Sequence, residues 1–509
     1  MLLAEPAAVP CMKRDFGFDS FVCVCNSSYC DTLPQVQGAA PGKALVYTSS
    51  KAALRFDKEE LTFTMPLDGD DTQTLTVNRS ETYQSVSGFG GAFTDSFGIN
   101  LVALPDEAQE LLLRSYFSPD GLEYNIGRVP IGGTDFSTRP YSYADNSPTK
   151  TLSNFELQKE DFTYKIPVIK RAIEMRQEKP NNVDKLLLYS SIWSPPAWMK
   201  TSNDLSGFGR LKEEFYQMYA DYFVKFLEAY EAQGLSFYCV STGNEPLNGI
   251  VPFKHFNSLG WFPTKKSKWI RENLGPTIRK SKFKDVKLLT HDDQRILLPW
   301  ELKKELEDNV TSSYIDMIGY HWYLNFITPS SILDSVHELW PNKPIINTES
   351  CNGDKPWQFT RVMPGSWDRG ELYLADIVEV MKHWTTGWID WNLALNREGG
   401  PTWAKNWVDA PIIVDANKGE FYKNPTYYAM AHVAKFVPRD SLRIGLKSAG
   451  GNFFSGTVES IAFLRPDGGI AVILVNKHNS EHRVTIRDPD RGEFTLSAPA
   501  KSFVSAIYW

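Results

Sequence analysis

The sequence predicts an α/β protein whose main domain is a (β/α)8 TIM barrel, joined to an all-β sandwich. Between Ser85 and Leu395, short β-rich runs alternate with longer stretches of helical periodicity, which is typical of a parallel sheet built from βα units. Eight parallel strands of this kind close into a barrel. The eight runs begin at Ser85, Tyr124, Lys185, Ser236, Val286, Ile315, Lys343 and Gly387.

The stretches between these runs have the apolar spacing of amphipathic helices. In LKEEFYQMYADYFVKFLEAYEAQG, this spacing is carried by Phe215, Met218, Tyr219, Tyr222 and Phe223. We expect these side chains to pack against the barrel. The eighth helix, PTYYAMAHVAKFV, follows an insertion rich in Trp and Gly at residues 396–423. That insertion falls in the eighth βα loop, on the face where such barrels carry their active sites.

Two further segments alternate between apolar and polar residues with the period of a β-strand. After Pro438, FLRPDGGIAVILVN is typical of a hairpin around a Pro-Asp-Gly-Gly turn. The segment 43–83 contains similar runs, KALVYTS and TQTLTVN. We expect these two segments, from opposite ends of the chain, to form one β-sandwich.

Composition and charge narrow the classes of function. At 509 residues the chain is longer than one hydrophobic core usually supports, so two or three domains are expected. The net charge of -7 argues against nucleic acid as a partner, because phosphate binding needs clustered Lys and Arg. No run of about 18 apolar residues occurs, so no transmembrane segment is expected. The GFGGA run lacks the spacing of phosphate-binding loops, and neither a cofactor nor a metal is expected.

Cysteine and asparagine motifs point to the secretory pathway. Four of the six cysteines lie close together, at Cys11, Cys23, Cys25 and Cys30. This density favours two disulfides in a small N-terminal unit; the alternative, a zinc site, has no histidine in the segment and poor ligand spacing. Glycosylation acceptors occur at Asn26, Asn78 and Asn309. The first ten residues resemble the end of a trimmed signal or a cloning remnant.

Carboxylates, amides and tryptophans follow several of the predicted strands. In a barrel enzyme the reactive side chains lie at the carboxyl ends of the strands, and these residue types are the ones that a sugar site requires. The polar and aromatic residues at these strand ends include Asp135, Trp193, Asn244, Glu245, His321, Trp322, Tyr323, Glu349, Asp390, Trp391 and Asn392.

Two of these residues, Glu245 and Glu349, meet the requirement of glycoside cleavage for an acid and an opposing carboxylate. They are 104 residues apart, or three βα units of about 35 residues, which places them on strands four and seven. Strands in these positions face one another, so a carboxyl separation of about 5–5.5 Å, the value of retaining enzymes, is expected. Either glutamate alone could be an ordinary surface carboxylate, but its place at a strand end favours catalysis. Asn244 can hydrogen-bond a sugar 2-hydroxyl.

The chain resembles the glucocerebrosidase family, that is, the lysosomal acid β-glucosidases or glucosylceramidases, essentially from end to end. The motifs that carry the resemblance are CVCNSSYCD, SGFGGAFTDS, YNIGRVPIGGTDFS, IWSPPAWMKT, GNEP, LLTHDDQR, GYHWYLNF, NTESC, SWDRG, DWNLALNREGGPTW, DAPIIVD and FYKNPTYY. One departure is Gly243, where the vertebrate enzyme has an acidic residue; it leaves the preference for the leaving group open.

The resemblance implies a retaining β-glucosidase that hydrolyses glucosylceramide to glucose and ceramide at acid pH by double displacement. It implies that Glu245 is the acid/base and Glu349 the nucleophile. The residues implied to hold glucose are Asp135, Trp193, Asn244, Trp391 and Asn406. The residues implied to support the glutamates are Arg128, Tyr323 and His321.

The resemblance also implies pairing of Cys11 with Cys23 and of Cys25 with Cys30. A small disulfide-bearing sheet would comprise residues 1–36 and 396–424, the sandwich 37–84 and 440–509, and the barrel 85–395 and 425–439. The implied location is the lysosomal lumen, peripheral to membranes, with a saposin-type activator and an anionic phospholipid surface as partners. Two alternatives remain: a related β-xylosidase or β-glucan hydrolase, and a non-catalytic sugar-binding or carrier protein. The presence of both glutamates argues against the second.

Overall fold

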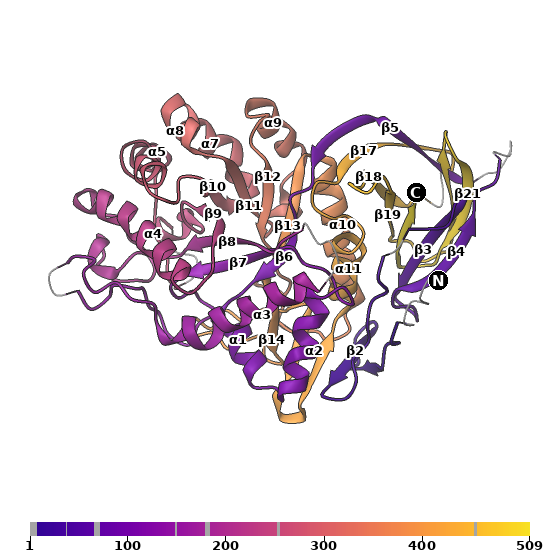
Figure 1. Cartoon of the computed structure of the whole chain (residues 1–509), viewed down its shortest axis with the longest axis horizontal. Helices are drawn as coiled ribbons and strands as arrows, with labels where there is room; N and C mark the ends of the chain where they lie inside the picture. Colours follow the sequence, from indigo (N-terminus) through magenta and orange to yellow (C-terminus); the bar gives the residue numbers. More distant parts are fainter. Residues whose placement is uncertain are drawn as a thin grey trace.

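The computed structural model describes residues 8–36, 38–65, 72–147, 150–178, 184–251, 255–451 and 456–509. Its centre is a closed barrel of eight parallel strands (Figure 1). In barrel order these are β6 (Gly88–Ala92), β7 (Ile126–Ile131), β8 (Leu187–Ile192), β9 (Phe237–Ser241), β10 (Lys287–Gln294), β11 (Met317–His321), β12 (Ile345–Glu349) and β13 (Thr385–Asn392). All eight runs predicted from the sequence are therefore strands of one barrel.

Helices surround this barrel. They are α1 (Asp95–Val102), α2 (Asp106–Phe117), α3 (Ile166–Gln177), α4 (Tyr216–Glu231), α5 (Pro263–Trp269), α6 (Gly275–Lys280), α7 (Leu298–Leu306), α8 (Asn309–Tyr314), α9 (Ser331–Leu339), α10 (Trp367–Lys382) and α11 (Pro425–Ala434). On α4, Tyr219, Tyr222 and Phe223 are fully buried, which confirms that these aromatic side chains are packing residues. None of the described helices is both long and apolar enough to cross a bilayer.

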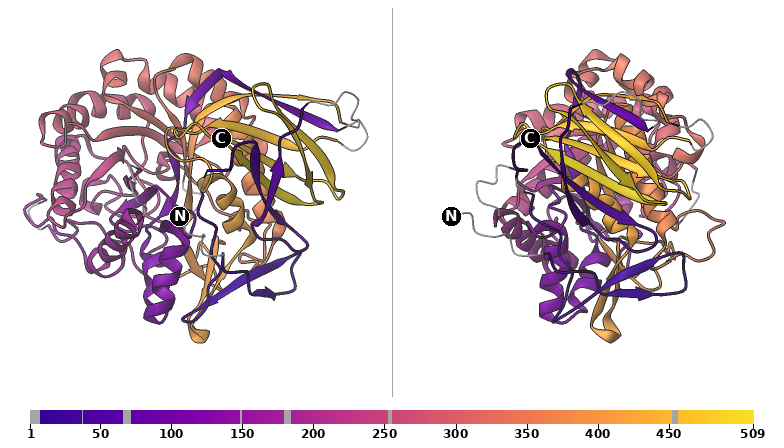
Figure 2. Two further views of the ribbon diagram at one scale, coloured as in Figure 1. Left: turned by 45° about the vertical axis from the view of Figure 1, so that its right-hand side comes forward. Right: turned by 90° about the vertical axis from the view of Figure 1, so that its right-hand side faces the viewer.

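Nine strands form a second sheet beside the barrel, visible on the right of Figure 1 and from two other sides in Figure 2. In sheet order they are β21 (Gly492–Ala498), β20 (His482–Asp488), β5 (Gln73–Ser85), β17 (Leu442–Ala449), β18 (Glu459–Leu464), β19 (Ile470–Asn476), β22 (Ser502–Tyr508), β3 (Lys43–Ser50) and β4 (Asp57–Thr62). A bridge between Thr64 and Glu493 joins the two edges. Both ends of the chain thus contribute to the sandwich, and β18 and β19 form the expected hairpin.

A third, smaller sheet joins the N-terminal segment to the eighth βα loop. Its order is β1 (Lys13–Asp15), β2 (Phe21–Asn26), β16 (Glu420–Lys423), β15 (Ile412–Asp415) and β14 (Ala394–Asn396). The disulfides Cys11–Cys23 and Cys25–Cys30 both lie in this unit. The precise domain boundaries stay predictions. Residues 1–7, 37, 66–71, 148–149, 179–183, 252–254 and 452–455 of the predicted ranges lie outside the described residues.

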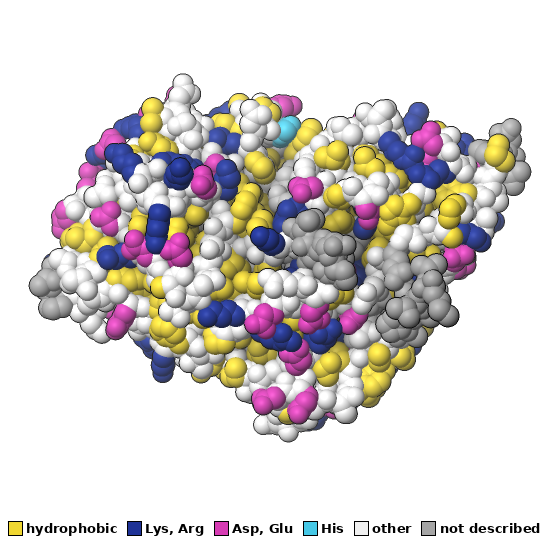
Figure 3. All heavy atoms as spheres, in the orientation of Figure 1, with side chains coloured by type: hydrophobic (Ala, Val, Ile, Leu, Met, Phe, Trp, Pro, Cys, Tyr) yellow, Lys and Arg dark blue, Asp and Glu magenta, His cyan; other side chains and the backbone are white. Residues whose placement is uncertain are grey.

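Acidic and basic side chains are mixed over the described part of the face shown in Figure 3. Neither sign forms a continuous patch on this face. Such mixing is typical of an ordinary solvated protein surface.

Candidate active site

The two glutamates singled out in the sequence meet at the carboxyl end of the barrel. Glu349 is the last residue of β12, and Glu245 follows the end of β9, directly before the 3-10 turn Pro246–Gly249. A carboxylate oxygen of each lies within 4.8 Å of the other and of a ring nitrogen of His321. Retaining glycosidases have carboxyl groups about 5–5.5 Å apart, whereas inverting enzymes need a wider gap that admits water. The spacing fits the retaining arrangement.

Two hydrogen-bond donors hold Glu349. Nη1 of Arg128, on β7, donates to Oε2 of Glu349, and the Tyr323 hydroxyl donates to Oε1 at 2.7 Å. Burial alone would lower the pKa of Arg128, but Asp292 and Glu349 outweigh it and raise this pKa. Nη2 of Arg128 also donates to Oδ1 of Asn244 at 2.8 Å. Because two donors fix both of its oxygens, Glu349 is held in one orientation, as a nucleophile requires.

Three side chains contact Glu245. His321 Nδ1 lies 2.9 Å from Oε1, and Nε2 of Gln294 donates to the same oxygen at 2.8 Å. The amide nitrogen of Asn248 lies 2.5 Å from Oε2. Both oxygens of Glu245 therefore have partners among these side chains.

His321 links the two sides of the site. Its Nε2 lies 3.2 Å from Oδ1 of the buried Asp292, and its Nδ1 lies 4.0 Å from Oε1 of Glu349. Burial opposes the charged form of His321, but Glu349, Asp292 and Glu245 raise its pKa to about 10. Burial would likewise raise the pKa of Asp292, yet Arg128 and His321 hold it well below the usual range. The site thus contains a fixed positive charge on each side of Asp292.

Asp292 and Gln294 are site residues that the sequence alone did not predict. Asp292 also accepts hydrogen bonds from the hydroxyls of Ser191 and Thr348, both at 2.6 Å. The available signal was the polar end THDDQ of the fifth predicted strand, which lies at the same edge of the barrel as Glu245 and Glu349.

Among the described residues, Glu245, His321 and Glu349 are close enough together to be considered as metal ligands. Their contacts argue against this use. A histidine that is protonated has no free lone pair for a metal, and the oxygens of Glu349 already accept hydrogen bonds from Arg128 and Tyr323. The trio is better described as a hydrogen-bonded acid–base cluster.

The structure also gathers the predicted sugar-binding residues. Trp193 and Trp391 stack with ring centroids 5.1 Å apart, and Nδ2 of Asn406 donates to Asp135 at 2.7 Å. Both tryptophans are almost fully buried, so they are also packing residues. Trp193 follows β8, Trp391 lies on β13, and Asn406 comes from the insertion after β13. Their roles stay predictions.

The predicted glycosylation sites lie on the surface. Asn78 and Asn309 are exposed and Asn26 is half-buried. Their side chains are accessible in the folded chain, and modification of these residues stays a prediction.

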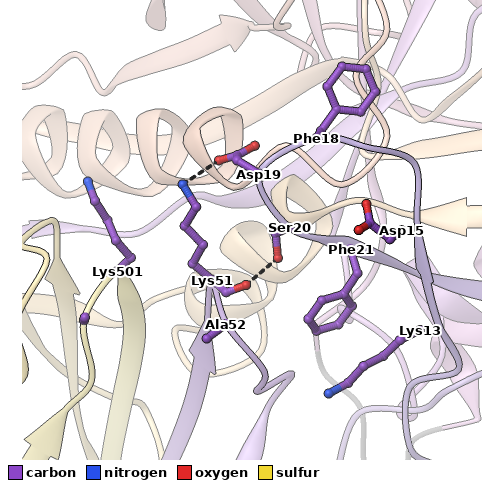
Figure 4. A pocket seen from close by; sticks show the side chains of 10 residues that line it. Lys13, Asp15, Phe18, Asp19, Ser20, Phe21, Lys51, Ala52 and Lys501 are labelled. Atoms are coloured by element: carbon purple, nitrogen blue, oxygen red, sulfur yellow. Dashed lines mark hydrogen bonds and ion pairs between the residues drawn. The ribbon is translucent and has the colours of Figure 1, made fainter.

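A cavity of 630 Å³ lies away from the glutamates, between the small sheet and the sandwich (Figure 4). An ion pair of Lys51 with Asp19, at 3.0 Å, crosses it. The residues that line it include Lys13, Phe18, Phe21 and Lys501. It contains neither Glu245 nor Glu349, so it is separate from the candidate active site.

Comparison with protein families gives the assignment. The Glycosyl hydrolase family 30 TIM-barrel domain matches residues 86–437, and the family's beta sandwich domain matches residues 440–506. The chain belongs to glycosyl hydrolase family 30. This membership confirms the family resemblance and the fold class predicted from the sequence, and it makes the protein a glycoside hydrolase.

Named relatives of this family 30 hydrolase cover almost its whole length. The lysosomal acid glucosylceramidase of Mus musculus is 42% identical over 98% of this chain and 96% of that protein. SrfJ from Salmonella typhimurium superposes with a TM-score of 0.81 at 25% identity, over 92% of this chain and 99% of that chain. The endo-beta1,6-glucanase BT3312 superposes with a TM-score of 0.78 at 25% identity, over 91% of this chain and 99% of that chain.

Proposed function

We propose that this family 30 hydrolase is a retaining β-glucosidase that cleaves glucosylceramide into glucose and ceramide. Glu349 is the nucleophile and Glu245 the acid/base. The observation that carries the proposal is the close approach of the two carboxylates, with Glu349 held by two donors and Glu245 held separately. The similarity to the mouse glucosylceramidase over nearly the whole chain supports the choice of substrate.

In the first step, an oxygen of Glu349 attacks the anomeric carbon of the glucoside. Glu245 gives its proton to the glycosidic oxygen as the bond from the anomeric carbon to that oxygen breaks, and ceramide leaves as an alcohol. The product on the enzyme is a glucosyl ester of Glu349. Tyr323 and Arg128 keep the attacking carboxylate in place while its charge is lost to the new bond.

In the second step, Glu245 takes a proton from water, and that water attacks the anomeric carbon of the ester. The bond between this carbon and Glu349 breaks, and Glu349 regains its charge. Two inversions at one carbon return the β-configuration. Early NMR spectra of the released sugar should therefore show β-glucose, and an initial α-signal would contradict the double displacement.

The glucose ring would be held by the groups gathered around the glutamates. Asp135 and Asn406, joined at 2.7 Å, offer an acceptor and an amide to sugar hydroxyls. Asn244, oriented by Arg128, is placed to contact the 2-hydroxyl, a contact that strengthens in the transition state. Trp193 and Trp391 supply apolar surface against the ring.

Exposed aromatic side chains near the active site support binding at a lipid surface. They lie on segments that follow β11 and β12, the strands of His321 and Glu349. Phe326 and Trp357 are each 57% exposed, and their rings lie 5.6 Å apart; Phe359 is 92% exposed. Exposed apolar clusters of this kind mark interaction surfaces. We propose that this cluster contacts the membrane that holds the lipid substrate.

The proposed setting is the lysosomal lumen, reached through the secretory pathway, with the enzyme peripheral to membranes. The two disulfides and the three accessible acceptor asparagines support an oxidising route. A saposin-type activator and an anionic phospholipid surface remain the proposed partners. Because anionic lipid is the partner proposed, turnover should increase when it is added.

Turnover of glucosylceramide in vesicles at acid pH, with and without anionic phospholipid, tests the proposal. Wild-type enzyme should release glucose, faster with anionic lipid, and Glu245→Ala should lose this activity while it retains cleavage of 2,4-dinitrophenyl β-glucoside, which needs little protonation. A β-1,6-glucan and an aryl β-xyloside test the alternatives; the likeness to the endo-beta1,6-glucanase favours the glucan as the second candidate. Preference for either over glucosylceramide would overturn the substrate assignment.

A further inference from the structure

The end of β10 contacts the segment of Glu245 through three hydrogen bonds. Nε2 of Gln294 donates to Oε1 of Glu245 at 2.8 Å, and the backbone N–H of Glu245 donates to the carbonyl of Asp292 at 2.9 Å. Oδ2 of Asp293 accepts from the backbone N–H of Leu247 at 2.9 Å. The other oxygen of Asp293 accepts from the backbone N–H of Gln294 at 2.7 Å. One carboxylate therefore ties the two segments together.

The backbone on both sides of this contact is strained. Glu245 has a φ of 41°, and His291 and Asp292 have φ values of 71° and 54°. Strand β10 also shifts its register against β11 between His291 and Asp293. Non-glycine residues adopt this left-handed region only where surrounding contacts hold them there. The bond of Asp293 to Leu247 and the bond of Gln294 to Glu245 are two of the side-chain contacts that hold this segment, beside those of His321 and Asn248.

A buried histidine supports Gln294 from behind. His291 Nε2 lies 3.2 Å from the carbonyl of Gln294, and its Nδ1 lies 3.0 Å from Oε2 of Glu301 on α7. Both neighbours are acceptors: Glu301 forms an ion pair with the ring when it is protonated, and Nε2–H can donate to the carbonyl of Gln294. Burial opposes this charge, but Glu301 outweighs it and raises the pKa of His291. Helix α7 is thereby connected to the residue that contacts Glu245.

Asp293 is completely buried, and the groups that face it are Glu245, Glu301 and His291. Burial, with the negative charges of Glu245 and Glu301, raises the pKa of Asp293 to about 7. At acid pH the side chain is therefore uncharged and adds no repulsion beside Glu245. It can accept its two backbone hydrogen bonds in that form.

We propose that Asp293 and Gln294 are positioning residues that hold Glu245 in place for proton transfer. The inference rests on the proposed function, in which Glu245 is the acid/base. It predicts that both residues matter only for steps that use Glu245: departure of a poor leaving group, and attack of water on the glucosyl ester. Attack on a substrate whose leaving group needs no proton does not depend on them.

Leaving-group dependence separates this role from a merely structural one. In Asp293→Asn, one of the two backbone N–H groups faces the side-chain NH2 group and loses its acceptor. The kcat/KM on an alkyl β-glucoside should then fall about ten- to hundredfold, because a misplaced Glu245 protonates the leaving group less efficiently. The kcat/KM on 2,4-dinitrophenyl β-glucoside should change less than about threefold. Azide should raise kcat on that substrate and yield β-glucosyl azide. Gln294→Met, which keeps the chain length and removes the amide, should show the same split.

A matched control lies just before β11, where Asp316 contacts the backbone of the same strand, β10. Oδ2 of Asp316 accepts from the backbone N–H of Leu288 at 2.8 Å, at the other end of β10 and away from Glu245. Asp316→Asn should change kcat/KM on both substrates by the same factor. If Asp293→Asn does not fold, as judged by its thermal unfolding transition, Gln294→Met decides alone.

Equal losses on both substrates for Asp293→Asn or Gln294→Met, or no loss, would overturn the inference. Glu245→Ala measured in parallel keeps this failure apart from failure of the proposed function. If Glu245→Ala loses more kcat/KM on the alkyl glucoside than on the dinitrophenyl glucoside, and the positioning variants do not, only the inference is refuted. No split in Glu245→Ala itself refutes the acid/base assignment on which it rests.

Discussion

Arg128 donates a hydrogen bond to Glu349 although both side chains are almost completely buried, at 2% and 7% exposure. A buried guanidinium is stabilised only when its donors are satisfied, and here Asn244 and Asp292 take the remaining contacts of Nη2. One residue on β7 thus fixes two side chains together: Glu349, the proposed nucleophile, and Asn244, the proposed ligand of the sugar 2-hydroxyl.

Arg128→Lys should lower kcat/KM at least about a hundredfold, because an ammonium does not reproduce the forked geometry that reaches several partners at once. The loss should be the same for alkyl and dinitrophenyl glucosides, since the nucleophile acts on both. A loss confined to the alkyl glucoside would show that Arg128 acts on the acid instead. Thermal unfolding of the variant checks that the buried charge is still accommodated.

Tyr323→Phe removes the hydrogen bond of 2.7 Å to Oε1 of Glu349 and keeps the ring. Burial, together with the nearby Cys351 and Glu349, raises the pKa of Tyr323 well above its usual value, so the hydroxyl remains a donor at every working pH. We expect kcat/KM to fall about ten- to hundredfold, the size of effect of one preorganised donor. An unchanged rate constant for formation of the glucosyl ester in single-turnover experiments would contradict this role.

His321 should contribute to stability in a pH-dependent way. Its folded pKa of about 10 is raised above the usual value near 6.5. The contribution is therefore complete below about pH 6.5 and is lost as pH rises through 10. In urea denaturation at about pH 6, the free energy of unfolding of the wild type should exceed that of His321→Gln by several kcal/mol. This difference should shrink by about 1.4 kcal/mol for each pH unit between the two pKa values. If the difference between the two free energies of unfolding stays constant up to about pH 10, His321 does not carry the positive charge.

His432 should make the stability of the fold depend on pH in the opposite direction, so that stability is lost at acid pH. It is fully buried between the hydroxyls of Ser505 and Ser49, at 2.8 and 2.9 Å, and burial lowers its pKa to about 3. Its folded form stays neutral while the unfolded chain takes up a proton below about pH 6.5, so stability falls as the pH drops from there toward 3.

By about pH 4.5 this difference should cost about 2–3 kcal/mol. His432→Gln, which cannot titrate, should lose correspondingly less free energy of unfolding than the wild type between about pH 7 and 4.5. Identical pH slopes in the two proteins would contradict the neutral buried histidine.

Much of the fold was predictable because its signals are local. Eight β-rich runs and the helices between them predicted the barrel, and the polar strand ends predicted Glu245 and Glu349 as a pair, which the structure brings together. The beginning of α4 at Tyr216, after a 3-10 turn at Glu213–Phe215, was not predicted, since amphipathic spacing does not define where a helix begins.

The contacts around Glu245 were not predictable. The left-handed backbone at His291 and Asp292 has no sequence signature, because neither residue is a glycine. Without knowledge of this backbone, the side chains at the end of β10 cannot be assigned to a face of the barrel sheet. The pairing of β5 with both β17 and β20 is equally hidden, because alternation predicts a strand and not its partners.

The most direct test of the account is covalent trapping of the nucleophile. Incubation with a 2-deoxy-2-fluoro-β-glucoside bearing an activated leaving group should form the glucosyl ester and slow its hydrolysis. Peptide mass spectrometry should then find the fluorosugar on Glu349, and Glu349→Gln should show neither label nor turnover. Labelling of any other residue, or full turnover by Glu349→Gln, would contradict the assignment of Glu349 as the nucleophile.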